Sequence, residues 1–114
     1  MLEFRRLDTT NKPKLKVRNV EYVHYHTSTE GNEAYCTHAY LGSKTFLCEL
    51  VYLPDGRWYF HVEIKDNLLF DSRIGKKYFF SASDAHNKMI NSILEKYERK
   101  ESAKFTKVKS TKKR

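Results

Sequence analysis

The chain has 114 residues with a formal net charge of +8, and its hydrophobic content of 39% lies below the roughly 45–50% typical of globular domains. This length allows one domain with a modest core, and two cysteines are too few for a disulfide scaffold. The sequence contains neither an apolar run of about 18 residues, which would predict a membrane span, nor an apolar N-terminal secretory signal, so we expect an intracellular protein of the cytoplasm or nucleoid with no membrane partner.

The positive charge is concentrated at the two ends of the chain. Residues 100–114 carry seven Lys or Arg against one acid, residues 1–23 carry six against three, and residues 24–99 carry nine against ten. Fourteen of the sixteen aromatic residues lie between Tyr22 and Tyr97, which indicates that the core forms from the middle. We therefore divide the chain into an N-terminal arm (1–14), a single α+β domain (15–99) and a basic C-terminal tail (100–114).

Four basic residues occupy alternate positions where the arm meets the domain. Alternate side chains of an extended strand lie on the same side, so these cations are placed to follow a phosphate backbone. They are Lys12, Lys14, Lys16 and Arg18.

Residues 15–27 and 34–41 are predicted to be two strands of a hairpin. One closure of its loop brings four metal-ligand side chains face to face, His24 with His38 and His26 with Cys36. Three imidazoles and a thiolate suit tetrahedral zinc. The spacing differs from that of a zinc finger, and a shift of one residue sends the two pairs to opposite faces. We keep these four residues as an alternative zinc set and predict no metal or other cofactor.

The stretch from Lys44 to Lys65 predicts another hairpin. In the turn Leu53-Pro54-Asp55-Gly56-Arg57, Pro54 fixes its φ and Gly56 accepts a positive φ. With Leu53 opposite Arg57, one face of both strands is wholly apolar, which predicts both the register and the core face. The facing pairs are Tyr52–Trp58, Leu50–Phe60, Cys48–Val62 and Phe46–Ile64.

The opposite face of this hairpin is mixed in polarity. It carries Leu47, Glu49, Val51, Tyr59, His61, Glu63 and Lys65. One interpretation is the solvent side of an antiparallel sheet. The other is a stacking platform on which Tyr59 and His61 contact unpaired bases.

Short strands at residues 68–73 and 78–80 and one helix from about Ala82 to Arg99 are predicted to complete the domain. Ser81 is a helix cap, with Asp84 three residues later as in a capping box. An apolar stripe at helical spacing must be buried against the sheet. We therefore predict an α+β fold: an antiparallel sheet of four to six strands, packed on one face by a C-terminal amphipathic helix and followed by the basic tail.

Catalytic chemistry has little support in the sequence. Glu49 and His61 are cross-strand neighbours of the kind used in acid–base catalysis, but surface ion pairs of this kind are more common. Cys36 and Cys48 have no identifiable catalytic partners, and no Gly-rich loop follows a strand. We expect that the protein is not an enzyme.

The basic tail is the remaining signal. We expect a small accessory protein that binds DNA or RNA mainly through phosphate contacts of its termini. The alternative is a small inhibitor or adaptor, of the kind that phages and mobile elements encode, which docks on an acidic protein partner such as a nucleic-acid-handling enzyme. The tail cations are Lys104, Lys107, Lys109, Lys112, Lys113 and Arg114.

Overall fold

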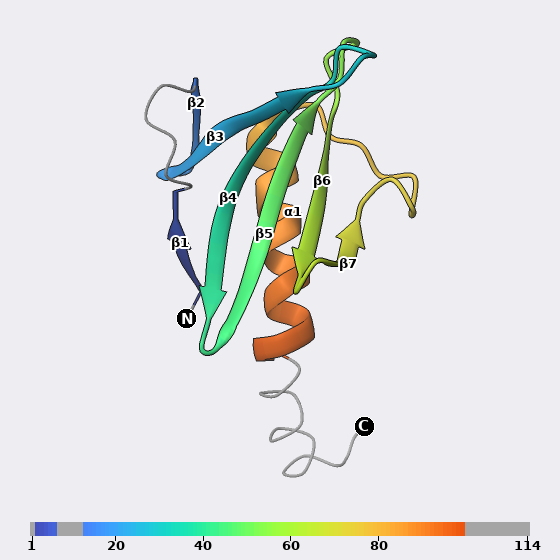
Figure 1. The fold of residues 1–114 in the computed structure, drawn as a ribbon. Helices are drawn as coiled ribbons and strands as arrows, with labels where there is room; N and C mark the ends of the chain where they lie inside the picture. Colours follow the sequence, from blue (N-terminus) through green and yellow to red (C-terminus); the bar gives the residue numbers. More distant parts are fainter. Residues whose placement is uncertain (1, 7–12, 100–114) are drawn as a thin grey trace.

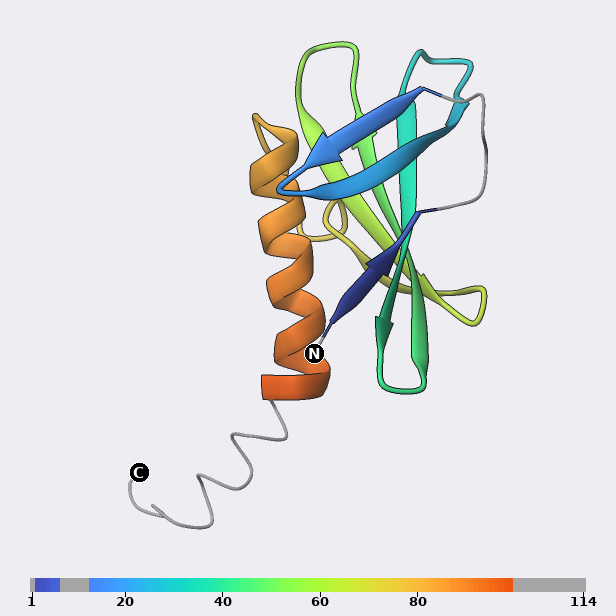
Figure 2. The ribbon, with the colours of Figure 1, turned by 90° about the vertical axis from the view of Figure 1, so that its left-hand side faces the viewer.

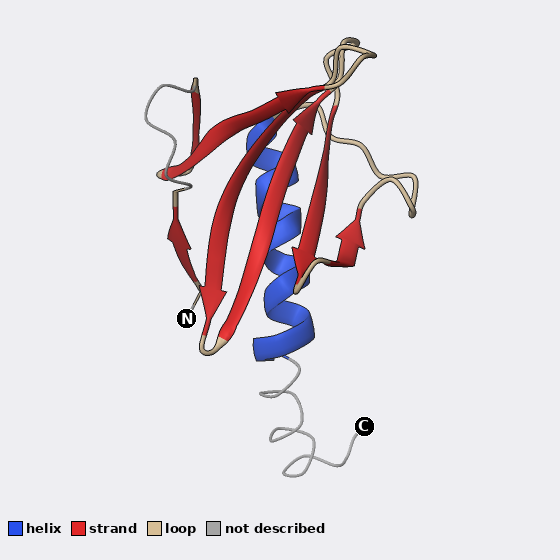
Figure 3. Cartoon of the chain, viewed as in Figure 1, coloured by secondary structure: helices blue, strands red, loops and turns tan. Residues whose placement is uncertain are grey.

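A computed structural model describes residues 2–6 and 13–99, with the side chains of the last helical residues described as far as Tyr97. It contains a seven-stranded antiparallel sheet with one C-terminal helix packed on one face (Figure 1, Figure 3). The predicted α+β class is confirmed, with seven strands instead of four to six. The strands are β1 (Glu3–Arg5), β2 (Lys14–Val17), β3 (Val20–Thr27), β4 (Glu33–Leu41), β5 (Lys44–Tyr52), β6 (Trp58–Ile64) and β7 (Asn67–Asp71), and the helix is α1 (Ala82–Leu94), extended by a π-helical turn η1 (Glu95–Arg99).

Consecutive strands are neighbours in the sheet, whose order is β2-β3-β4-β5-β6-β7. The edge of β4 that faces β3 has two partners. β3 pairs with its first half, up to Cys36, and β1 pairs with its second half, from His38 to Tyr40. The sheet therefore divides at this edge, and Figure 2 shows the β2–β3 hairpin diverging from β1 there.

The β5–β6 hairpin has the predicted register. Leu50 pairs with Phe60 and Cys48 with Val62, and the N–H of Gly56 donates to the carbonyl of Leu53 at 2.9 Å. Gly56 has a φ of 95°, which a residue without Cβ adopts without strain. The prediction succeeds because turn chemistry and hydrophobic alternation specify the same register.

The N-terminal half of the sheet differs from the prediction. Residues 15–27 are not one strand, because Arg18 and Asn19 form a tight turn between β2 and β3 with φ values of 49° and 69°. Two positive φ values are the requirement of a type I′ hairpin turn. Asn tolerates that conformation, but Arg carries no such signal. The predicted strand at 78–80 is also reduced, to one bridge between Phe79 and Trp58.

The helix packs where its apolar stripe predicts. Its N-cap is Ser81, whose hydroxyl accepts from the N–H of Asp84 at 3.0 Å. Ala85, Met89 and Ile93 are fully buried against the sheet, and each large apolar side chain removed from water contributes roughly 1.5–3 kcal/mol. The sheet side of this core includes Tyr22, Ala39, Phe46, Cys48, Leu50, Phe60 and Val62.

One polar pair lies inside this core. The phenol oxygen of Tyr22, a fully buried residue, lies 2.5 Å from Nδ1 of His86, which is 5% exposed. Burial, followed by the positive charge of Arg18, lowers the pKa of His86 from 6.5 to about 4. The pair is thus held in its neutral form, with the phenol of Tyr22 and Nδ1 of His86 as hydrogen-bond partners inside the core.

Candidate functional site

The outer face of the sheet, which lies on the side away from α1, is not the open stacking surface that the sequence suggested. Tyr59 is only 7% exposed. The guanidinium carbon of Arg73 lies 4.0 Å from the centre of its ring, and Tyr78 meets the ring edge-on at 6.5 Å. Burial is the main cause of the raised pKa of Tyr59. The ring face that was expected to stack on a base is therefore occupied by residues from the segment after β7.

His61 is also engaged. Its Nδ1 lies 3.2 Å from a carboxylate oxygen of Asp71, and its Nε2 lies 2.9 Å from one of Glu63. Burial lowers the pKa of His61, but these two hydrogen bonds outweigh burial, so the net pKa is raised. The imidazolium form, in which both nitrogens donate, satisfies both carboxylates.

Asp71 joins His61 to Arg73. Burial raises the pKa of Asp71, but the hydrogen bonds from Arg73 and His61 bring it down to about 2. Arg73 donates from its terminal nitrogen at 2.6 Å and from Nε at 3.0 Å. His61, Asp71 and Arg73 thus form a network of charge-assisted hydrogen bonds, in which both nitrogens of His61 and both oxygens of Asp71 have partners within the protein.

Neither thiol is activated: Cys36 lies beside this network on the outer face, and Cys48 lies in the core on the inner face. Cys36 is fully buried, and its S–H donates to Glu49 at 3.4 Å. Burial, and then the negative charge of Glu49, raises the pKa of Cys36, and burial raises that of Cys48 to about 12. A nucleophilic cysteine needs the opposite shift.

The zinc arrangement requires a register that the structure does not have. His24 pairs with Tyr35, and His26, which follows a bulge, pairs with Ala34. Cys36 therefore faces Val23, and His38 faces Arg5 of β1. Within residues 2–6 and 13–99, no three His, Cys, Asp or Glu side chains are grouped closely enough to hold a metal ion.

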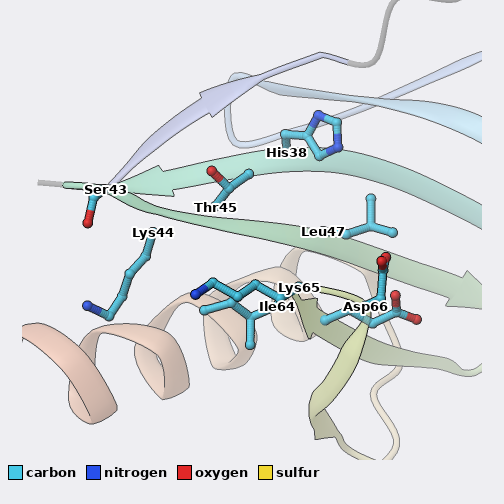
Figure 4. A pocket seen from close by; sticks show the side chains of 9 residues that line it. His38, Ser43, Lys44, Thr45, Leu47, Ile64, Lys65 and Asp66 are labelled. Atoms are coloured by element: carbon cyan, nitrogen blue, oxygen red, sulfur yellow. The ribbon is translucent and has the colours of Figure 1, made fainter.

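An open hollow of about 520 Å³ lies at the end of the outer face, between the β4–β5 and β6–β7 turns (Figure 4). His38, Thr45 and Leu47 line one part of it. Its charged lining consists of two lysines and two carboxylates, so its net charge favours no particular class of ligand. The charged residues are Lys44, Lys65, Glu63 and Asp66.

The N-terminal cations are only partly in line. Lys14 and Lys16 are exposed on the edge strand β2, whereas Leu15 and Val17 between them pack toward the core. Arg18 lies in the turn and not on the strand. Lys12 and the six tail cations (Lys104, Lys107, Lys109, Lys112, Lys113 and Arg114) lie outside the described residues.

A second aromatic surface was missed at the sequence level. On the inner face, at the end of the sheet where α1 begins, four rings from four strands form a chain of contacts. The centroid distances are 5.3 Å for His24–Tyr35, 6.3 Å for Tyr35–Trp58 and 4.7 Å for Trp58–Tyr52. We call these four residues the aromatic strip. The pairing of Tyr52 with Trp58 was predicted. The positions of His24 on β3 and Tyr35 on β4 beside them depend on the register of β3 with β4 and of β4 with β5, which the sequence did not predict.

Comparisons with known proteins do not assign the chain to a family. No family model, no curated protein and no solved structure matches the chain. No helix within the described residues is long and apolar enough to cross a membrane.

Proposed function

We propose that this chain is a small accessory protein that binds DNA or RNA mainly through phosphate contacts of its basic termini. The observation that carries the proposal is the distribution of charge. Residues 100–114 hold seven basic residues against one acid, and Lys14 and Lys16 are exposed side by side along the edge strand β2. Lysines placed in this way neutralise successive phosphates and release counterions.

The ion pairs of two arginines support phosphate binding by the lysines of the edge strand and the tail. Arg73 is bonded to Asp71, and Arg57 is bonded to Asp55 at 2.8 Å. These arginines are already neutralised, so phosphate binding falls to the edge strand and the tail. Tyr59 and His61 are not part of the proposed interface, because their neighbours within the protein occupy them.

The test is binding of a labelled oligonucleotide to the full chain and to a chain that ends at Arg99, at 50 mM and 200 mM salt. If about six phosphates are neutralised, affinity falls by about 10³-fold between these salt concentrations. The truncation would remove most of the affinity, and Lys14→Gln with Lys16→Gln would reduce the salt dependence further. The matched control is Lys65→Gln with Lys76→Gln, which removes two exposed lysines elsewhere. Absence of binding at both salt concentrations would contradict the proposal.

A second function, docking on an acidic protein, has one observation in its favour. Ile74 and Phe80, in the segment between β7 and α1, are 74% and 85% exposed. Large apolar side chains so exposed are typical of interface anchors. Under this alternative, Phe80→Ser would leave the stability of the fold nearly unchanged and abolish binding to the protein partner, whereas oligonucleotide binding would be absent from the start.

A further inference from the structure

A small apolar crevice lies between the sheet and the helix, separate from the aromatic strip. Its volume is about 150 Å³. Phe60 of β6 and Phe70 of β7 form its apolar surface, the turn after β7 forms one side, and Lys88 of α1 lies on the other. Figure 1 shows the chain leaving β7 through this turn and returning to the start of α1. The remaining residues that line the crevice are Asp71, Ser72, Gly75 and Lys77.

The crevice has room because position 75 carries no side chain. A Cβ on Gly75 would lie 3.7 Å from Cγ of Lys77 and 4.0 Å from the carbonyl oxygen of Ser72. Both distances are ordinary van der Waals contacts, and the φ of Gly75 lies outside the left-handed region. The backbone conformation therefore does not require a glycine here, and what the glycine provides is space.

The size of the crevice and its two phenylalanines define the apolar part of a ligand. An apolar cavity of about 150 Å³ holds one benzene-sized ring. Phe60 belongs to the main core and is 4% exposed, whereas Phe70 is half-buried. A ring that enters the crevice contacts both aromatic side chains and removes the exposed part of Phe70 from water. The crevice thus fits a single six-membered ring or a branched alkyl group of similar size.

The polar side chains at the crevice favour an anion. Lys77 and Lys88 are exposed, and neither has an ion-pair partner within residues 2–6 and 13–99. The hydroxyl of the buried Ser72 accepts from the N–H of Phe60 at 3.1 Å, and its own proton is left to donate to a ligand. Two ammonium groups and one hydroxyl are the donors that a carboxylate needs.

The acidic residue of the lining does not oppose an anion. Asp71 pairs with His61 in the sheet, so its side chain points to the outer face, whereas α1 and the crevice lie on the inner face. Its carboxylate accepts from Arg73 at 2.6 Å and lies 3.2 Å from Nδ1 of His61. The charge of Asp71 is therefore compensated on the outer face, and the two lysines determine the sign of the potential at the crevice.

We propose that the crevice binds a small organic acid in which one aromatic ring, or an alkyl group of the same size, is joined to a carboxylate. The ring lies against Phe60 and Phe70, and the carboxylate lies at the mouth of the crevice within reach of Lys77 and Lys88. An apolar pocket with a few convergent polar groups is the usual form of a small-molecule site. This site is independent of nucleic-acid binding, because none of its residues belongs to the edge strand β2 or to the basic tail.

The test is an NMR titration of the isotope-labelled full chain with phenylacetate. We expect saturable shifts of the amide signals of Gly75, Lys77 and Lys88, with a Kd on the order of 1 mM for a ligand of about ten non-hydrogen atoms. Acetate has the carboxylate without the ring and is expected to bind at least about 10-fold more weakly. 2-Phenylethanol has the ring without the carboxylate and is expected to bind about 5-fold more weakly, because it forms no ion pairs with the lysines.

Variants of the lining separate the apolar contacts from the charge. Gly75→Leu places a side chain in the space that the ring would take and is expected to abolish binding of phenylacetate. Lys77→Gln with Lys88→Gln is expected to weaken binding of phenylacetate by about 5-fold and not to change binding of 2-phenylethanol. The matched control is Lys14→Gln with Lys16→Gln, which removes two exposed lysines from the opposite edge of the sheet and is expected to bind phenylacetate as the unmodified chain does.

Three results would overturn the inference. If acetate binds as well as phenylacetate, or if the control pair of variants weakens binding as much as the crevice pair, the probe responds only to the net charge of +8. If 2-phenylethanol binds as tightly as phenylacetate, the lysines do not recognise the carboxylate. If Gly75→Leu binds phenylacetate normally, the probe lies elsewhere. None of these results bears on oligonucleotide binding, so the two proposals can fail separately.

Discussion

Acidification is expected to destabilise this fold through the buried His86. Its pKa falls from 6.5 to about 4 on folding, so between these values the unfolded chain binds more protons than the folded one. Stability is therefore fully retained above pH 6.5 and is lost as the pH falls toward 4. A difference of this size corresponds to about 3 kcal/mol in total, of which about 2 kcal/mol is lost by pH 5.

The assay is urea denaturation at pH 8, 6.5 and 5, for the unmodified chain and for His86→Leu with Tyr22→Phe. The double variant removes the titrating ring and the phenol together, so that neither leaves an unpaired polar group in the core. We expect the unmodified chain to lose about 2 kcal/mol more than the variant between pH 8 and pH 5. His26→Gln is the control, because His26 is exposed.

His61 acts in the opposite direction. Its pKa is raised by Glu63 and Asp71, so its contribution is present below pH 6.5 and is lost as the pH rises through its folded value. The double variant of Tyr22 and His86 keeps this contribution, which isolates the effect of His86. An NMR titration that places the His86 ring near 6.5, or equal acid sensitivity in the unmodified chain and the variant, would refute the reasoning.

Two further predictions concern the helix and the thiols. Ser81→Ala removes the acceptor for the N–H of Asp84 and is expected to cost about 1 kcal/mol in thermal or urea unfolding, whereas Ser83→Ala in the same turn would serve as the unaffected control; equal stability of the two would argue against the cap. Cys36 and Cys48 are buried with raised pKa values, so a thiol reagent at pH 8 is expected to modify both in urea and neither in the folded chain, and rapid labelling without urea would show that the core opens.

The fold could be predicted where turn or cap residues and the pattern of apolar residues indicate the same structure. The β5–β6 register follows from Pro54 and Gly56 and from the apolar residues that alternate along both strands to form one face. The helix start follows from Ser81 with Asp84. The β2–β3 turn was not predictable, because Arg18 takes a positive φ without any of the residues that usually signal one.

The candidate site was harder to predict than the fold, because it depends on contacts between segments that are far apart in the sequence. Whether Tyr59 is free depends on Arg73 and Tyr78, which lie beyond β7 in sequence and return over the outer face. The zinc set does not assemble because the hairpin loop closes with Thr27 opposite Glu33, so that His24 pairs with Tyr35, three residues from the His38 that the predicted register requires. Register across a hairpin decides which side chains share a face.

Each face of the sheet departs in one part from what its polarity suggested. The sequence of the outer face suggested a half-polar surface open to solvent. Instead, Ala34, Val51 and Tyr59 form a small second core there, and Arg73 and Asp71 form an ion pair on the same face. The inner face looked wholly apolar and destined for burial, yet the helix begins after Phe79 has bridged to Trp58. The rings at that end consequently remain partly exposed. Alternation therefore predicts which face of a strand is apolar, but the position of the helix along the strands decides how far each apolar side chain is buried.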